Sequence, residues 1–552
     1  MTWLRHYVVV LAFLAAVAGL AFRVSYLTVT EGQFLAHQGD ARSIRSETIE
    51  AHRGGIYDRH GEVLALSTPV RAAWTDPSRY TFSASELERI AAVLELPVAT
   101  LNERLGPTAR RTRQFAYLKR QLNEADVAAL TALEIDGLFF RTEYRRFYPA
   151  AEVAAHVVGN TSVDDLGLEG IELAFDRQLS GQPGNRRVLK DRRGNLIDVL
   201  SYGDHARFGM DLTLSIDLRL QYLAYRELKA AVQDQRAVGG SLVMLDARSG
   251  EVLAMVNQPS YNPNEPLPAD YAGQRNIAVT DTFEPGSTVK PFTVLAALEA
   301  GTFEPGTVID THPGYLRVGN KLIEDPVNRG ELTLTDALAR SSQVAIAKVA
   351  LALEPRAVFD VLARAGLGAF IGTGLPGEAP GRLTDEGLDS PLVRSVLAYG
   401  YGLAVSPLQL AQAYLTLATG GVYRPVTVLR QAQPEHGQRV FAAAQTRQVL
   451  GMMEAVTAAG GTAPEARLAH YRVAGKTGTA RKLRDGAYND DRHVALFAGI
   501  APASAPRIVM IVIVDEPNTR RVGGGATAAP IFAQVADQAL KLLGAAPDLG
   551  TL

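Results

Sequence analysis

FEPGSTVKPFTVL, residues 283–295, places one serine and one lysine three residues apart at the start of an apolar run. A Pro-Gly break precedes Ser287, and the apolar run after it predicts a helix. Positions i and i+3 of a helix share a face, so the Ser287 hydroxyl and the Lys290 amine can meet. Pro291 fits this helix only if the helix begins near Ser287, because the first turn needs no N–H donor.

Two interpretations of Ser287 are open from this stretch alone. In the first, Ser287 caps a helix and Lys290 lies on the surface, since S-x-x-K occurs by chance in long chains. In the second, Ser287 is a nucleophile and Lys290 is its base, which requires burial or a neighbouring cation to lower the pKa of the lysine. The N–H groups at a helix start would then suit a developing oxyanion.

Two further motifs favour a nucleophilic serine. The segment RSSQ lies between two predicted helices, and GKTGT lies on an apolar stretch before a loop. Together they carry the polar or flexible residues Ser341, Gln343, Lys476, Thr477, Gly478 and Thr479. An acylating serine needs a base, a proton relay, a cation for a substrate carboxylate and N–H donors for the oxyanion. S-x-x-K with S-D-N and K-T-G marks penicillin-binding proteins and class A β-lactamases, and here the middle motif is S-S-Q.

The composition excludes several classes of function. The chain has 552 residues, which predicts two or three domains, and 47% of them are hydrophobic. A net charge of −2 gives no general attraction to nucleic acid. Cysteine is absent and the 10 histidines are scattered, so we expect no disulfide, no metal site and no cofactor.

The N-terminal stretch is apolar and nearly long enough to cross a membrane. Residues 1–27 contain no charged side chain between Arg5 and Arg23, which is close to the lower limit for crossing a bilayer. The positive-inside rule places residues 1–6 in the cytoplasm and everything after Leu27 outside. A cleaved signal peptide is the alternative, because AAVAGLA offers the small residues that a signal peptidase accepts.

The remaining pattern predicts a mixed first half and an α+β second half. Alternating or helical spacing predicts strands around a turn in 51–67, helices in 83–96, 123–133 and 217–235, a hairpin in 239–256, helices from 287 to about 419, a second hairpin in 493–517 and a last helix in 529–545. The basic run 109–121 predicts a solvated face. Strands at both ends with helices between them predict an antiparallel sheet flanked by helices.

The chain resembles class B penicillin-binding proteins, and specifically their division-type peptidoglycan D,D-transpeptidases, over nearly its whole length. The similar blocks occur in the family's order: RGGIYDRHGEVLALS, RRFYPAAEVAAHVVGNTSVDDLGLEGIE (145–172), GEVLAMVNQPSYNPN, TDTFEPGSTVKP, YGYGLAVSPLQLAQAY (399–414), RVAGKTGTARK and GGATAAPIF (524–532). The resemblance implies a cytoplasmic tail (1–6), a transmembrane anchor (7–27), a mixed α/β pedestal of the dimerisation type (28–235), a transpeptidase domain of the serine β-lactamase and penicillin-binding type (236–545) and a C-terminal tail (546–552).

The resemblance also implies a mechanism. Ser287 would attack the penultimate D-Ala carbonyl of a stem peptide, with Lys290 as its base, and β-lactams would acylate it as substrate mimics. Ser341 would relay protons, while Lys476 and Thr477 would help the relay and hold the terminal carboxylate. An amine from a neighbouring stem peptide would then complete the crosslink during septal cell-wall synthesis.

Three other residues have implied roles around the substrate. Thr479 would shape the pocket and the oxyanion hole, and Gly478 would let the substrate backbone pair with the strand edge. Gln343 stands where the family usually has Asn, whose amide is expected to bind the acyl side of the substrate. Gln offers the same donors and acceptor on a stem one methylene longer, so we expect a shifted geometry, slower acylation or altered β-lactam preference.

The resemblance implies partners and a location as well. The expected partners are peptidoglycan stem peptides, β-lactams, a membrane, a glycan polymerase of the SEDS type and other division proteins. The expected place is the bacterial inner membrane, with one span and a periplasmic catalytic domain. The alternatives are an elongation-type transpeptidase, a D,D-carboxypeptidase of the same fold, or a weakly active paralogue that serves as a division scaffold or β-lactam sensor.

Overall fold

The computed structural model describes residues 2–34, 44–49, 51–190, 196–266, 268, 271–484 and 487–549. The chain divides into two compact units by its internal contacts. The first comprises Met1–Arg53 and Ser180–Met210, and the second comprises Gly54–Leu179 and Asp211–Leu552.

The first unit contains the predicted N-terminal helix and a small sheet. Helix α1 (Thr2–Ser25) continues into a π-helical turn, η1 (Tyr26–Thr30), and therefore covers the predicted anchor. Over Trp3–Thr30 the mean hydropathy is 2.3 and none of the helix is buried in protein, so it is long and apolar enough to cross a membrane. The sheet is antiparallel and three-stranded, in the order β1 (Ile44–Ile49), β6 (Gly184–Lys190) and β7 (Leu196–Tyr202).

The second unit begins with a sheet built around one long strand. Strand β3 (Val63–Thr75) pairs antiparallel with its three neighbours β2 (Ile56–Tyr57), β4 (Ala116–Leu122) and β5 (Phe139–Phe147). Strand β8 (Leu212–Thr213) runs parallel to β2 and leads the chain back from the first unit. The turn predicted within 51–67 is present between β2 and β3, and Gly61 adopts the positive φ of 91° that this turn requires.

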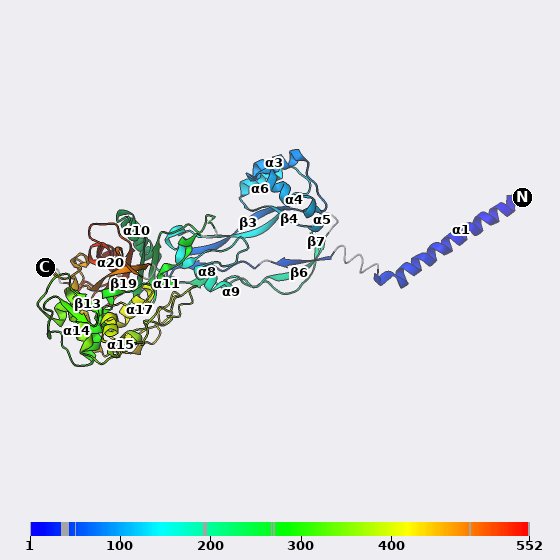
Figure 1. Cartoon of the computed structure of the whole chain (residues 1–552). Helices are drawn as coiled ribbons and strands as arrows, with labels where there is room; N and C mark the ends of the chain where they lie inside the picture. Colours follow the sequence, from blue (N-terminus) through cyan, green and yellow to red (C-terminus); the bar gives the residue numbers. More distant parts are fainter. Residues whose placement is uncertain are drawn as a thin grey trace. The chain divides into compact units, whose positions relative to one another are not determined.

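Helices cover one part of this sheet (Figure 1). They are α3 (Ala84–Leu94), α4 (Val98–Leu105), α5 (Pro107–Thr112) and α6 (Glu124–Ala132). Four short helical segments follow β5 in the chain and lie apart from this group: η2 (Ala151–Val153), α7 (Ala155–Val158), α8 (Gly170–Ala174) and α9 (Asp176–Leu179). Two of the predicted helices begin at capping side chains: Ser83 forms a capping box with Glu86, and Asn123 accepts from the Asp126 N–H. Ile90 and Leu130 pack in one apolar cluster with Leu118 of β4, so this small core is continuous with the sheet.

A five-stranded antiparallel sheet forms the centre of the larger part of the second unit. Its order is β10 (Val252–Gln258), β9 (Gly239–Asp246), β19 (Ile508–Asp515), β18 (Ala487–Ala501) and β17 (Ala474–Arg484). All the residues of β9 and β10 are buried, because helices cover both faces. The alternation along β9 divides the core, with Leu242 and Met244 in one apolar cluster and Val243 and Leu245 in another.

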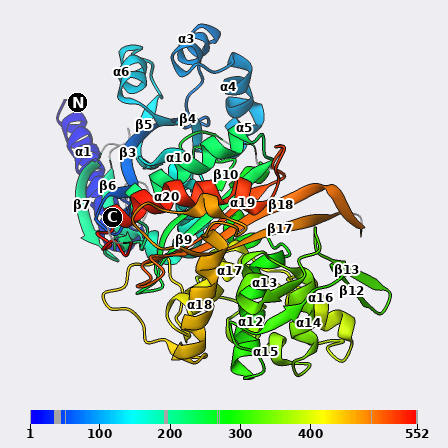
Figure 2. The same ribbon diagram turned by 90° about the vertical axis from the view of Figure 1, so that its left-hand side faces the viewer.

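Two helical layers enclose this sheet (Figure 2). One consists of α10 (Leu218–Asp234) and α20 (Ala529–Leu542), with the short α19 (Gly524–Thr527). The other includes α17 (Pro407–Ala418), α18 (Ala443–Thr457) and α12 (Lys290–Glu299). The prediction of an antiparallel sheet flanked by helices is confirmed. Helix α10 begins at Asp217, whose side chain accepts from the Arg219 N–H.

The segment from 287 to 419 is less uniformly helical than predicted. Besides α12 and α17, its helices are η4 (Gly286–Val289), α13 (Leu334–Ala339), α14 (Gln343–Leu351), α15 (Ala357–Arg364) and α16 (Pro391–Ala398). Short helices before and after the segment are η3 (Ala272–Gln274), α11 (Ile277–Thr280) and η5 (Pro464–Ala466). It also contains the strand pairs β11 (Val308–Asp310) with β14 (Glu331–Thr333) and β12 (Tyr315–Val318) with β13 (Lys321–Glu324), while β15 (Val422–Tyr423) pairs with β16 (Gln438–Arg439) just beyond it. These strands are two to four residues long and mostly exposed, so they lack the apolar run that would have predicted them.

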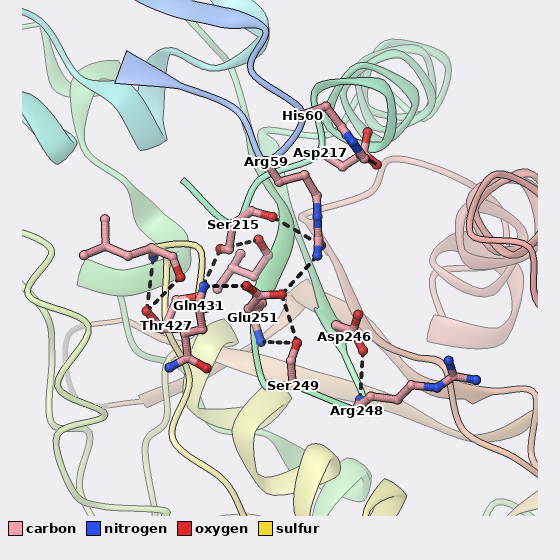
Figure 3. A network of polar contacts seen from close by, with 12 residues as sticks. Arg59, His60, Ser215, Asp217, Asp246, Arg248, Ser249, Glu251, Thr427 and Gln431 are labelled. Carbon is pink, nitrogen blue, oxygen red and sulfur yellow. Dashed lines mark hydrogen bonds and ion pairs between the residues drawn. The ribbon is translucent and has the colours of Figure 1, made fainter. Parts of the chain in front are cut away.

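A buried carboxylate joins the β2–β3 turn to the large sheet (Figure 3). Glu251 is 4% exposed, and its Oε2 lies 3.1 Å from Arg59 Nη2 and 3.1 Å from the Ser249 hydroxyl that donates to it. Its Oε1 accepts from the Gln431 N–H at 2.9 Å. We call Glu251 with Arg59, Ser249 and Gln431 the Glu251 network, and in it both carboxylate oxygens are paired.

Candidate active site

The predicted serine lies on a short 3₁₀ turn rather than on the α-helix itself. Turn η4 (Gly286–Val289) holds Ser287, and α12 begins at Lys290, so Pro291 falls in the first turn as the spacing requires. Neither element has a side-chain cap, and the residues at their cap positions are Pro285 and Val289. The capping interpretation of Ser287 is therefore wrong, and its hydroxyl is left for another role.

Two neighbouring segments hold the serine turn in place. The backbone of Gly400 approaches the turn closely because this residue has no side chain: a Cβ there would lie 1.9 Å from the Gly286 carbonyl oxygen. The Gly400 carbonyl accepts from the Gly286 N–H at 3.0 Å. From the other side, the buried Tyr414 of α17 donates its hydroxyl to the Thr288 carbonyl at 2.7 Å. This support from Tyr414 could not be predicted from the sequence, because the contact joins residues 126 positions apart.

Two buried lysines meet at one hydroxyl. Lys290 Nζ lies 3.2 Å from Ser341 Oγ and 2.6 Å from the Ser341 carbonyl oxygen, and Lys476 Nζ lies 2.9 Å from the same Oγ. Both lysines have 0% exposure. Ser341 lies between α13 and α14 and adopts a φ of 57°, in the left-handed region that residues other than glycine seldom adopt. The structure therefore brings together three of the predicted residues, and we call Lys290, Ser341 and Lys476 the lysine cluster.

The expected bond between Ser287 and Lys290 is not formed in this conformation. Among the described residues, the Ser287 hydroxyl makes no hydrogen bond, and the Lys290 amine donates to Ser341 instead. Ser287 is nonetheless half-buried on the turn immediately before Lys290, and hydrogen bonds of catalytic groups often tighten only with a substrate.

Burial lowers the pKa of both lysines. For Lys290 the pKa falls to about 7, because desolvation disfavours the ammonium and Arg329 adds repulsion, while the Asp325 carboxylate opposes the fall. For Lys476 the pKa falls well below its usual value, because of burial and then repulsion from Lys290. A neutral amine near neutral pH is thus available to accept a proton.

Strand β17 carries the K-T-G motif at the edge of the large sheet, next to the serine turn. A Cβ on Gly478 would lie 2.9 Å from Thr288 Cγ2 and 3.1 Å from the Pro285 carbonyl oxygen, so the glycine permits the close approach of η4. Thr477 shares a hydrogen bond of 2.9 Å with Thr462, and Thr479 accepts from the Gly524 N–H at 3.4 Å. These contacts fix the strand beside Ser287.

Asp325 is a residue of the site that sequence reasoning missed. It follows β13, is 9% exposed, and accepts from the Ser342 hydroxyl at 2.5 Å and from the Gln343 N–H at 2.6 Å. Ser342 in turn caps α14 by accepting from the Ala345 N–H. Asp325 therefore holds the backbone of the S-S-Q motif, and only the fold of the unpredicted β12–β13 hairpin brings it there.

Within the ranges that the structure describes, no group of three or more His, Asp or Glu residues is arranged to hold a metal ion.

A family comparison agrees with this geometry. Residues 240–537, more than half of the chain, match the penicillin binding protein transpeptidase domain, and residues 48–214 match the penicillin-binding protein dimerisation domain. The chain belongs to the penicillin-binding proteins of class B, which combine these two domains.

Particular relatives place it more closely. It is 41% identical over 541 residues to the peptidoglycan D,D-transpeptidase FtsI of Escherichia coli K12, covering 97% of this chain and 91% of the relative. It is 38% identical over 544 residues to the probable peptidoglycan D,D-transpeptidase PbpC of Pseudomonas aeruginosa, covering 99% and 96% of the two chains. The predicted likeness to division-type transpeptidases is confirmed.

Solved structures show the same fold. The crystal structure of penicillin binding protein 3 from Mycobacterium tuberculosis complexed with aztreonam matches with a TM-score of 0.71 at 27% identity, covering 91% of this chain and 98% of that chain. The transpeptidase domain of Burkholderia pseudomallei penicillin-binding protein 3 matches with a TM-score of 0.56 at 37% identity, covering 61% and 98%. The predicted fold class is confirmed.

Proposed function

We propose that this protein crosslinks peptidoglycan stem peptides as a D,D-transpeptidase of septal wall synthesis, through an acyl-enzyme on Ser287. The lysine cluster is the observation that carries the proposal, because two desolvated amines that share the Ser341 hydroxyl form a proton-transfer path next to the turn that holds Ser287. The resemblance to FtsI over 97% of the chain supports the substrate.

In the first half of the reaction the neutral Lys290 takes the Ser287 proton while Oγ attacks the penultimate D-Ala carbonyl. The N–H groups of Ser287 and Thr479 stabilise the oxyanion. The C–N bond to the terminal D-Ala then breaks, and Ser341 passes the proton from the lysines to the departing amine. This leaves an ester on Ser287 and a neutral relay.

In the second half an amine from a neighbouring stem peptide attacks the ester. It loses its proton to the lysine cluster, and the proton returns to the Ser287 oxygen as the ester bond breaks. The products are an amide crosslink and free Ser287, so that no cofactor is consumed.

The substrate roles follow from the edge position of β17. Its unpaired edge can receive the stem-peptide backbone at Gly478, with Lys476, Thr477 and Thr479 at the terminal carboxylate. The Gln343 side-chain amide binds the acyl side of the substrate, and Asp325 holds the backbone of this residue by accepting from its N–H. β-Lactams acylate Ser287 as mimics of D-Ala-D-Ala.

The proposal also includes the domain bounds and the cellular location of the protein. We assign residues 1–6 to a cytoplasmic tail, 7–27 to a membrane anchor, 28–235 to the pedestal, 236–545 to the transpeptidase domain and 546–552 to a tail. The catalytic domain then lies in the periplasm, and the anchor and pedestal contact a SEDS-type glycan polymerase and other division proteins.

Intact-mass measurement with benzylpenicillin tests the nucleophile. We expect one penicilloyl adduct, mapped to the peptide that contains Ser287, and none in Ser287→Ala. Ser390→Ala is the matched control, because Ser390 is half-buried, makes no cap hydrogen bond and lies outside the site. An adduct that persists in Ser287→Ala would refute the assignment.

A further inference from the structure

The sheet around β3 carries a pocket that the proposed reaction does not use. It lies along β4 and beside α4, and has a volume of about 630 Å³, within the range typical of ligand sites. The residues that define it are Arg104, Arg113, Phe115, Tyr117, Lys119 and Arg120, and we call it the β4 pocket. The basic run that the sequence predicted as a solvated face supplies most of them.

The charges of the β4 pocket favour an anion. Its lining contains four cationic side chains and no carboxylate. Arg120 is occupied, with Glu143 at 3.0 Å and Asp164 at 2.5 Å. Among the residues that the structure describes, Lys119 donates to the Leu94 carbonyl alone, at 2.8 Å, which leaves two of its three N–H groups for a ligand. The Arg113 side chain is exposed and bonds to no other described residue.

An aromatic wall lies beside these cations. Phe115 stacks on Trp74, with ring centroids 4.8 Å apart, and meets Tyr117 edge-on at 4.7 Å. The Arg120 guanidinium covers the Tyr117 ring at 4.7 Å, so the rings are held in place from both sides. Phe115 is nevertheless 37% exposed, which leaves part of its surface open to a ligand.

The backbone of β4 is less suited to a protein partner. β4 is the last strand of its sheet, and a free strand edge can accept an added peptide strand. Arg104, however, already donates to the Leu118 carbonyl within β4. Side chains rather than main-chain groups therefore make the recognition surface.

We infer that the β4 pocket binds an anionic glycan. A pyranose ring packs its C–H groups on Phe115, and a carboxylate of the same chain accepts from Arg113 and Lys119. The inference rests on the proposed function, which supplies the polymer: the nascent peptidoglycan strand, with its sugar rings and stem-peptide carboxylates. The pocket then holds the strand at a second point while Ser287 reacts with one of its stem peptides.

The protein contains its own reporter for this binding. Trp3 and Trp74 are its two tryptophans, and Trp3 lies in α1. In the variant Trp3→Phe, tryptophan fluorescence therefore comes from Trp74 alone, one ring away from the pocket. The full chain, placed in phosphatidylcholine nanodiscs, is titrated with soluble uncrosslinked peptidoglycan strands, and the β-lactam acylation rate is measured in parallel.

We expect a saturable change of Trp74 emission that weakens with added salt. In that background Arg113→Glu should weaken strand binding about tenfold or more, because it reverses a charge that contacts the carboxylate. Phe115→Ala should also weaken binding, through loss of the ring contact. Arg111→Glu makes the same charge change two residues away, outside the pocket lining, and should change binding by less than about twofold.

Three results would overturn the inference. One is no saturable binding of the strands, and another is an equal loss in Arg113→Glu and Arg111→Glu, which would indicate general attraction. The third is a Trp74 response to phosphatidylglycerol in the nanodiscs without any response to the strands, which would indicate a membrane surface. The acylation rate should be unchanged in all these variants, so a failure here is distinguishable from a failure of the Ser287 mechanism.

Discussion

The Glu251 network and the lysine cluster are both buried polar groups, but they solve the problem of burial in opposite ways. Glu251 has a cation, a hydroxyl and an N–H on its two oxygens, so its charge is neutralised where it lies (Figure 3). Lys290 and Lys476 share one serine hydroxyl and, in the part of the chain that the structure describes, have no carboxylate bonded to them, so burial lowers the pKa of both amines, and repulsion from Lys290 lowers that of Lys476 further. They reduce the cost of burial by losing protons. The first arrangement stabilises the fold, and the second prepares a base at the expense of stability.

The largest expected effect is on catalysis. Lys290→Met should slow acylation by benzylpenicillin about a thousandfold, within the range that general-base catalysis contributes. Stopped-flow or gel-based acylation rates measure it. Lys541→Met, at an exposed lysine paired with Asp537, is the control and should acylate normally. A loss of less than tenfold in Lys290→Met would mean that another group removes the Ser287 proton.

The next effect concerns the paired carboxylate. Glu251→Ala should lower the free energy of unfolding by about 3 kcal/mol, because it leaves Arg59 and the Gln431 N–H without their acceptor. Urea denaturation measures it. Glu251→Gln keeps one acceptor oxygen and should lose less. Equal stability of Glu251→Ala and the wild type would show that the network contributes nothing.

The same substitution that damages catalysis should help the fold. Lys290→Met should raise the free energy of unfolding at pH 7 by about 1–2 kcal/mol, because it removes a buried amine. The sign can be checked by pH. The folded pKa of about 7 lies below the usual 10.5, so the wild type gains stability as pH rises between these values, and the advantage of Lys290→Met should shrink there. An advantage that is constant between pH 7 and pH 10 would contradict the lowered pKa.

The pH dependence of acylation should report the same amine. The rate should rise about tenfold per pH unit below pH 7 and level off above it, because only the neutral form of Lys290 accepts the Ser287 proton. Rates with benzylpenicillin between pH 5 and pH 9 measure this. A rate that keeps rising to pH 10 would indicate a lysine with an ordinary pKa.

The smallest effect is expected at the departure from the family motif. Gln343→Asn should raise the acylation rate by only a few-fold, since both amides offer the same groups and the backbone N–H stays bound to Asp325. Side-by-side acylation rates decide the point. A change of a hundredfold or more would show that the longer side chain controls the site.

Features that depend on residues close together in the sequence could be predicted, and features that depend on contacts between distant segments could not. The spacing of Ser287 and Lys290 and the β9–β10 hairpin are local, and their elements are present in the structure. Asp325 could not be predicted, because it reaches Ser342 through a hairpin too short and polar to recognise. The 3₁₀ form of η4 could not be predicted either, since the turn is bonded to Gly400 and Tyr414 from segments far along the chain.

The left-handed backbone of Ser341 carries a consequence for evolution in the laboratory. A residue with a side chain costs roughly 1–2 kcal/mol in that conformation, and glycine or asparagine would relieve much of it. Selection for heat resistance alone would therefore favour replacing Ser341 and would discard the hydroxyl that both amines share. Thermostable descendants that retain serine at this position would have to find their gains elsewhere in the chain.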